Sequence, residues 1–158
     1  MALASCTGAV GSVVPAASIP AAGASTGPSL DQASPSGEAS SPPLAGQTDT
    51  DWGRIWDSLP AGFPAYAGST PAEEAATGPA SAVLAVSGVE ARTIADWLRS
   101  KLELATYTTE ALSGPLEDGS FVLDLTGSTP GCRVQASIAP LGGLTIVTVR
   151  YGAACAKP

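Results

Sequence analysis

The amino-acid composition of the chain changes near residue 50, and this change limits where a folded core can form. Residues 1–48 hold 11 Ala, 9 Ser, 6 Gly, 6 Pro and 3 Thr, so these five residue types make up 35 of the 48. Such side chains bury too little apolar surface to offset the conformational entropy of an ordered backbone, roughly 1–2 kcal/mol per residue. Residues 1–50 are therefore predicted to be a disordered linker, or tether.

Residues 51–158 contain every aromatic and every basic residue of the chain. Aromatic side chains supply much of the core of a small domain, and a segment of this length suffices for one modest core. The segment carries 11 acidic residues against 7 basic ones, a net charge of −4 within a total of −7. We expect one small folded domain after the tether.

Several classes of function are excluded by composition. The sequence has no histidine, so a Ser-His or Cys-His catalytic pair and an imidazole metal site are impossible. An acidic chain with seven basic residues also lacks the electrostatic footprint of a nucleic-acid-binding protein. The acidic pairs Glu73-Glu74 and Glu117-Asp118 lack the spacing of a calcium loop and are interpreted as solvated loop residues. We expect no catalytic residue, no cofactor and no metal.

One amphipathic helix is predicted. Ser87 and Glu90 have the spacing of a capping box, and the helix is expected to continue to about Leu104. Arg92 to Asp96 and Arg99 to Glu103 are expected to form two ion pairs of one helical turn. The apolar face of the helix is expected to consist of Ile94, Trp97, Leu98, Leu102 and Ala105.

Short segments with alternating apolar residues predict the strands of a sheet. They are residues 80–86, 106–112, 120–126, 132–138 and 144–151, separated by Gly- and Pro-rich turns. The last segment is apolar on both faces, which is typical of a central strand. The predicted fold class is α+β, with one amphipathic helix packed on a four- to five-stranded, mainly antiparallel sheet in the order β-α-β-β-β-β.

Two segments before the first of these strands carry aromatic residues. Residues 51–57 contain Trp52, Ile55 and Trp56 and are predicted to form a short amphipathic turn that packs on the domain. Residues 59–68 carry Pro60 and Pro64, which favour an extended backbone. This segment is interpreted as a strap whose Phe63 and Tyr66 pack on the core edge, with a ligand groove as the alternative.

The first residues carry a targeting motif. Leu3-Ala4-Ser5-Cys6 resembles the bacterial lipobox, in which the cysteine receives a diacylglycerol and a peptidase cleaves just before it. The resemblance implies lipidation of Cys6, with the tether then holding the domain off the membrane. Only three residues precede the motif, whereas an export signal needs a basic region and an apolar stretch, so we expect those upstream of Met1. The alternative is an unmodified cysteine in the tether.

The other two cysteines are consistent with the same compartment. Cys132 and Cys155 do not form a CxxC motif, and no histidine is available to complete a zinc site. A pair exposed to an oxidising compartment is expected to form a disulfide. The alternative is two buried free thiols in a cytosolic domain.

The pattern of residues 59–155 resembles small uncharacterised lipoproteins of bacterial envelopes. It comprises an LP-x-x-FP-x-Y-x-G lead-in at residues 59–68, a strand, a helix with Ala95-Asp96-Trp97-Leu98, and a terminal run of strands. The resemblance implies location and fold but no activity.

These features predict a non-catalytic binding or accessory protein of the bacterial cell envelope, anchored in the membrane through a lipid on the extracytoplasmic side. We expect a monomer whose exposed sheet face binds an envelope protein or a small ligand. One alternative is a soluble secreted or cytosolic interaction domain without a lipid anchor. A second alternative is a small hydrolase that uses carboxylates.

Overall fold

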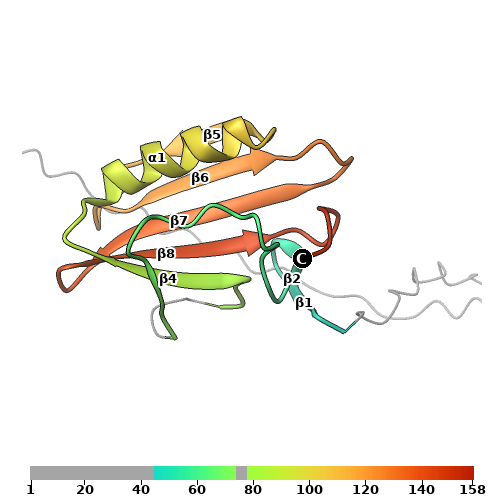
Figure 1. Ribbon diagram of the computed structural model, residues 1–158, viewed down its shortest axis with the longest axis horizontal. Coiled ribbons are helices and arrows are strands. Elements are labelled where there is room, and N and C mark those ends of the chain that lie inside the picture. Colours follow the sequence, from blue (N-terminus) through green and yellow to red (C-terminus); the bar gives the residue numbers. More distant parts are fainter. Residues whose placement is uncertain (1–44, 74–77) are drawn as a thin grey trace, which may run out of the picture. The chain divides into compact units, whose positions relative to one another are not determined.

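The computed structural model describes residues 45–73 and 78–158, which form a sheet, a helix and a hairpin (Figure 1). Cys6, Glu74 and most of the predicted tether lie outside the described residues. The helix is α1 (Ala91–Leu104), and the strands are β1 (Gln47–Thr50), β2 (Gly53–Trp56), β3 (Thr70–Pro71), β4 (Ala82–Ser87), β5 (Thr108–Ser113), β6 (Phe121–Thr126), β7 (Arg133–Leu141) and β8 (Leu144–Tyr151).

The sheet has six strands in the spatial order β3-β4-β8-β7-β6-β5, and all neighbours are antiparallel. The predicted α+β class is confirmed, and the expected β-α-β-β-β-β order is found in β4, α1 and β5 to β8. The predicted count of four to five strands is wrong. The additional strand is β3, a two-residue segment that pairs with Ala85 and Leu84 of β4. Two residues are too few to show an alternating apolar pattern, and proline is uncommon in strands, so the sequence did not predict this strand.

One face of the sheet forms the core with α1. The helix contacts β5, β6 and β7, and its buried residues recur at three- and four-residue steps: Ala91, Ile94, Ala95, Leu98 and Leu102. Trp97, a further expected member of the apolar face, is half-buried and packs against the core, whereas Ala105 is the exposed C-cap. The facing strand residues alternate as predicted; those of the three meander strands are Phe121, Leu123, Leu125, Val134, Ala136, Ile138, Val147, Val149 and Tyr151.

The strap, residues 59–68, covers the part of this face that the helix leaves open (Figure 1). The ring of Phe63 meets Tyr151 edge to face at 6.0 Å between centroids. The ring of Tyr66 meets Trp97 of the helix in the same way at 5.0 Å. Such pairs contribute about 0.5–1.5 kcal/mol beyond the burial of their area. The predicted packing of the strap on the core is confirmed.

The predicted capping box is wrong. Ser87 is the last residue of β4 and pairs with Leu144 of β8, so the strand runs through the expected N-cap and the helix begins three residues later than expected. Glu90 is itself the N-cap, and its side chain makes no capping hydrogen bond. Sheet pairing therefore overrides a local signal that contributes only about 1 kcal/mol.

Only one of the two expected helical ion pairs forms. Arg92 Nε lies 2.6 Å from Asp96 Oδ2, as predicted. Arg99 instead approaches the same carboxylate at 3.3 Å. Glu103, its expected partner, accepts a hydrogen bond from the Thr109 hydroxyl at 2.8 Å. All of these groups are partly exposed, so their contribution to stability is small.

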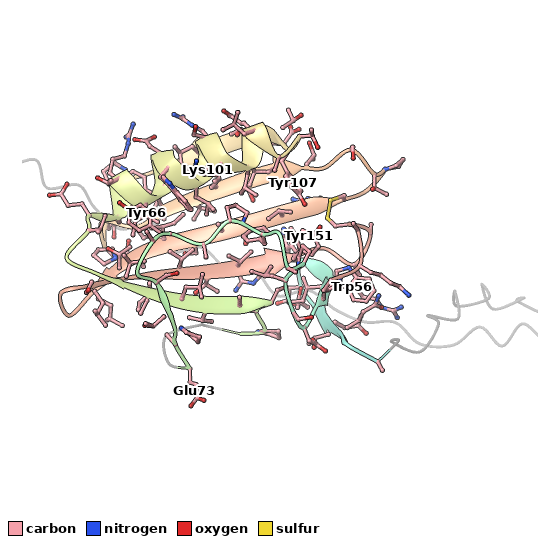
Figure 2. The ribbon with its side chains drawn as sticks, in the orientation of Figure 1. Trp56, Tyr66, Glu73, Lys101, Tyr107 and Tyr151 are labelled. Carbon is pink, nitrogen blue, oxygen red and sulfur yellow. A yellow bond between two sulfur atoms is a disulfide. The ribbon has the colours of Figure 1, made fainter. Side chains whose placement is uncertain are left out.

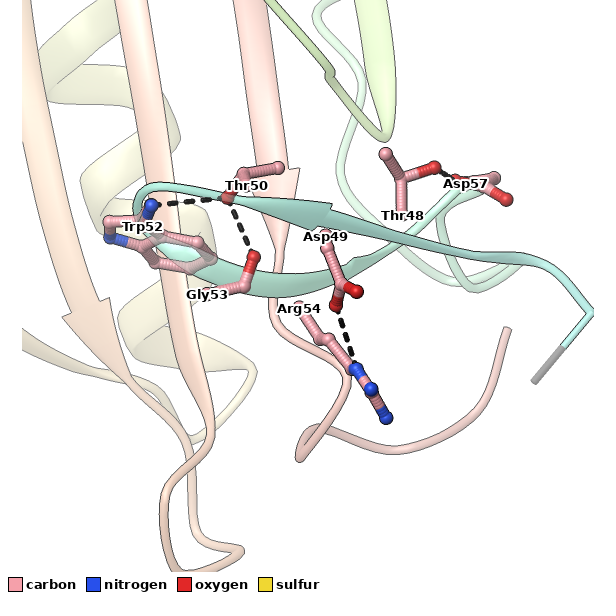
Figure 3. A network of polar contacts seen from close by, with 7 residues as sticks. All are labelled: Thr48, Asp49, Thr50, Trp52, Gly53, Arg54 and Asp57. Atoms are coloured by element: carbon pink, nitrogen blue, oxygen red, sulfur yellow. Dashed lines mark hydrogen bonds and ion pairs between the residues drawn. The ribbon is translucent and has the colours of Figure 1, made fainter. Parts of the chain in front are cut away.

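Residues 51–57 pack on the domain as predicted, but as part of a β-hairpin and not as a short amphipathic turn. They form the turn and second strand of the β1–β2 hairpin, which begins within the segment assigned to the tether. Figure 3 shows its polar contacts: Asp49 pairs with Arg54 at 2.7 Å, and the Thr50 hydroxyl donates to Gly53 O at 2.6 Å. The strand residues Ile55 and Trp56 are buried against the domain.

Ser81 joins the hairpin to the sheet. Its buried hydroxyl donates to Trp56 O and accepts the backbone N–H of Tyr151 at 2.8 Å. The hairpin is held further by a bridge between Ile55 and Gly152 and by Arg133, which lies 5.2 Å above the Trp52 ring.

Candidate functional site

The face of the sheet opposite α1 carries a hollow of about 470 Å³. Its floor comes from β7 and β8, where Ser137 pairs with Thr148 and Ala139 pairs with Ile146. Ser137, Ala139 and Thr148 have short side chains, which leaves space above this part of the sheet. The remaining lining residues are Asp118, Ser120, Pro140, Leu141 and Arg150.

A polar row crosses three strands at one end of this hollow. Gln135 Nε2 donates to Asp124 Oδ1 at 2.9 Å, and Arg150 Nη1 donates to Gln135 Oε1 at 3.1 Å. The three residues occupy neighbouring positions in the β6, β7 and β8 register. Arg150 Nε also donates to Pro79 O at 3.2 Å. The row holds the guanidinium in place against the hollow.

The β5–β6 turn supplies the other end. Asp118 Oδ1 accepts hydrogen bonds from the Ser120 hydroxyl at 2.6 Å and from the Ser120 N–H at 2.9 Å. These bonds, led by that from the hydroxyl, hold the pKa of Asp118 below its ordinary value of 3.8. Glu117 and Glu73 are exposed. Asp118 is thus an ionised turn residue, and it is the one carboxylate among the described residues that line this hollow.

The β7–β8 hairpin ends in an apolar tip beside the hollow. Gly142 and Gly143 have φ angles of 56° and 83°, as a two-residue type I′ turn requires, so the predicted hairpin is confirmed. Leu141 is 54 % exposed and Leu144 is 40 % exposed. They border a second, shallower hollow of about 510 Å³ on the α1 side of the hairpin.

A third cavity, of about 210 Å³, lies at the opposite end of the sheet and is called here the tyrosine cavity. The hydroxyls of Tyr107 and Tyr151 lie 3.0 Å apart in its wall. Figure 2 shows both residues at the end of the sheet that carries the disulfide. Burial, and secondarily the bond to Tyr107, raises the pKa of Tyr151 well above its ordinary value. The other lining residues are Ala105, Thr106, Gly127, Ser128, Thr129, Cys132 and Ala156.

The C-terminus of α1 positions Tyr107. The Tyr107 N–H donates to Leu102 O at 3.0 Å and the Thr106 N–H donates to Glu103 O at 3.1 Å, which is the Schellman pattern. The residue at its left-handed position is Thr106, with φ of 70°. Glycine is usual there, because a left-handed conformation costs other residues about 1–2 kcal/mol.

Cys132 and Cys155 form a disulfide next to this cavity, as predicted. It joins the start of β7 to the segment after β8, whose Gly152 N–H donates to Arg133 O at 2.9 Å. The α1 helix is too short and too polar to cross a membrane, and no other described segment is a candidate membrane-spanning helix. Within residues 45–73 and 78–158, no group of three or more Cys, Asp or Glu side chains is placed to hold a metal ion.

Comparison with known proteins gives no match, whether the chain is set against protein-family models, curated proteins or solved structures. A function for this chain is therefore argued from its own residues and their geometry.

The sequence indicated part of this arrangement. Strand alternation placed Asp124, Gln135 and Ser137 on the outer face, where they are found. Neither the hollow nor the tyrosine pair was anticipated, because both depend on the register between strands that are distant in sequence.

Proposed function

We propose that this chain is a non-catalytic binding module of the bacterial cell envelope, anchored on the extracytoplasmic side through a lipid on Cys6. The observation that carries the proposal is the disulfide between Cys132 and Cys155. Structural disulfides persist in oxidising compartments and are rare in the cytosol. Once these two cysteines are paired, Cys6 is the third and last cysteine of the chain, and it stands in the lipobox-like motif.

The helix-free face supports a binding role. Its hollow of about 470 Å³ lies in the range of ligand pockets, and it combines a carboxylate, a guanidinium and three hydroxyls. The exposed Leu141 and Leu144 beside it offer apolar contact area to a partner. A carboxylate hydrolase is disfavoured, because that chemistry uses two facing carboxyl groups and this hollow is lined by Asp118 alone among the described acids.

Mass spectrometry of the protein from native membranes tests the anchor. We expect the N-terminal peptide to begin at Cys6 and to carry the mass of a diacylglyceryl group, with Cys6→Ser abolishing both modification and membrane retention. An unmodified Cys6 in a soluble domain would instead favour the unanchored interaction domain.

Site-specific photo-crosslinking tests the binding face in the same membranes. A photoreactive residue at Ser137, in the hollow, is expected to give a discrete adduct. The same residue at Ser100, which is exposed on α1, serves as the matched control. Equal labelling at both positions, or none at Ser137, would contradict the assignment of the binding face.

A further inference from the structure

The tyrosine cavity contains a hydrogen-bond donor that the protein does not use. Two phenolic hydroxyls carry two hydrogens, and the bond between Tyr107 and Tyr151 takes up one of them. No other hydrogen bond of either hydroxyl is found among the described residues. Tyr151 is 1 % exposed and Tyr107 is half-buried, and either hydroxyl can be the donor of the bond between them, so the second hydrogen is left for a group in the cavity. An acceptor in the cavity would complete the pair.

The described lining of the cavity is uncharged. Thr106, Ser128 and Thr129 add three hydroxyls to the two tyrosines, and among the described residues no Asp, Glu, Lys or Arg lines it. A charged ligand group would meet no counter-charge among these described lining residues. Because burial keeps Tyr151 protonated, the pair presents a donor and not an anion.

The cavity is also small, and a disulfide holds one of its walls. Its volume of about 210 Å³ is below the usual range for a whole ligand, so it has room for one ring. A Cβ on Gly127 would lie 2.5 Å from Cys132 Sγ and 3.3 Å from Tyr107 Cε1, so these groups approach as closely as glycine allows.

The strained backbone conformation of Thr106 also lies at the tyrosine cavity. Thr106 keeps a left-handed conformation that is rare for a β-branched residue. Strain of this kind is concentrated at sites where it serves a role. Here it directs the chain so that Tyr107 reaches Tyr151 and the Thr106 side chain lines the cavity.

We propose that the tyrosine cavity binds a neutral, polyhydroxylated ring, the terminal sugar residue of a glycan. Sugar hydroxyls both donate and accept, which matches a wall with one surplus donor and three adaptable Ser and Thr hydroxyls. Among the described residues, the cavity and the hollow on the helix-free face have no lining residue in common. The proposal therefore goes beyond the proposed function and does not depend on the lipid anchor.

Titration of the oxidised full chain with neutral monosaccharides, followed by amide NMR, tests this proposal. The probes are glucose, galactose, mannose and N-acetylglucosamine, with glucuronate as a charged comparison. We expect at least one neutral sugar to shift the amides of Thr106, Tyr107, Ser128 and Thr129 in a saturable manner. Glucuronate is expected to bind at least tenfold more weakly, in keeping with the uncharged lining.

Two variants separate binding from folding. Tyr107→Phe is expected to weaken sugar binding about tenfold, the usual effect of removing one hydrogen bond. Ser128→Ala, in an exposed loop position, is expected to weaken it severalfold and stands in if Tyr107→Phe does not fold. Ser113→Ala, at the far end of β5, is the matched control and leaves affinity unchanged. The proposal is overturned if no neutral sugar shifts these amides, or if the folded variants bind as tightly as the parent.

Discussion

The hydroxyls of Tyr107 and Tyr151 lie 3.0 Å apart although 44 positions separate the two residues in the sequence. Their contact joins the turn after α1 to the end of β8, next to the disulfide. The contact of the two hydroxyls therefore links the C-terminus of α1 to the end of β8, at the edge of the core.

Tyr107→Phe is expected to lower the free energy of unfolding by about 1–3 kcal/mol, because it leaves the buried Tyr151 hydroxyl without its partner. The double variant with Tyr151→Phe is expected to cost less than the sum of the two single variants. Urea denaturation measures all three. Tyr66→Phe is the control, since no hydrogen bond of its hydroxyl is found among the described residues, and its effect should stay within about 0.5 kcal/mol.

Stability should fall at alkaline pH through Tyr151. Its pKa is raised in the folded protein above the ordinary value of 10.0, so the unfolded chain loses this proton first. The stabilisation is complete below pH 10 and is lost as the pH rises from there through the folded-state pKa. Denaturation between pH 8 and 11.5 tests this, and Tyr151→Phe should flatten the decline. An equally steep decline in that variant would contradict the assignment.

Thr106→Gly is expected to stabilise the domain by about 0.5–1 kcal/mol. Glycine relieves the left-handed strain of about 1–2 kcal/mol but adds entropy to the unfolded chain. The melting temperature and urea midpoint should both rise. Ala105→Gly is the matched control, because φ at Ala105 is −88°, so that glycine there only destabilises. A loss of stability in Thr106→Gly would show that its side chain makes a compensating interaction.

Removal of the disulfide by Cys132→Ala with Cys155→Ala is expected to cost about 3 kcal/mol. The bridge closes a loop of 23 residues, and this figure follows from loop-closure entropy for that length. A reductant should lower the urea midpoint of the parent and leave that of the double variant unchanged. A parent that resists denaturation equally well when fully reduced would refute this estimate.

Gly127→Ala is expected to destabilise the domain by about 1–3 kcal/mol through overpacking. The added methyl group meets Cys132 Sγ at 2.5 Å, and the disulfide prevents that sulfur from moving away. Gly62→Ala is the control, since a Cβ there meets nothing within 4 Å. Thermal unfolding of the two variants should differ clearly; equal melting temperatures would show that the disulfide end of the sheet can rearrange.

The sequence by itself determined the features that have a short period. Alternation in residues 120–126 and 132–138 predicted which side chains enter the core, and the two-sided apolar pattern of residues 144–151 marked β8 as central. The four-residue spacing of Ile94, Leu98 and Leu102 predicted the buried face of α1. These patterns are local consequences of strand and helix geometry, so a single segment is enough to read them.

Only the tertiary structure decided what happens where distant segments meet. Pairing with Leu144 kept Ser87 in β4 and overrode its capping signal, and the Ser81 hydroxyl found its partners in Trp56 and Tyr151. The hollow whose floor contains Ser137 depends on the register of β7 and β8, and the contact of Tyr107 with Tyr151 depends on how α1 ends. A one-residue shift in any strand would move these side chains to the other face, so no pattern within one segment contains them.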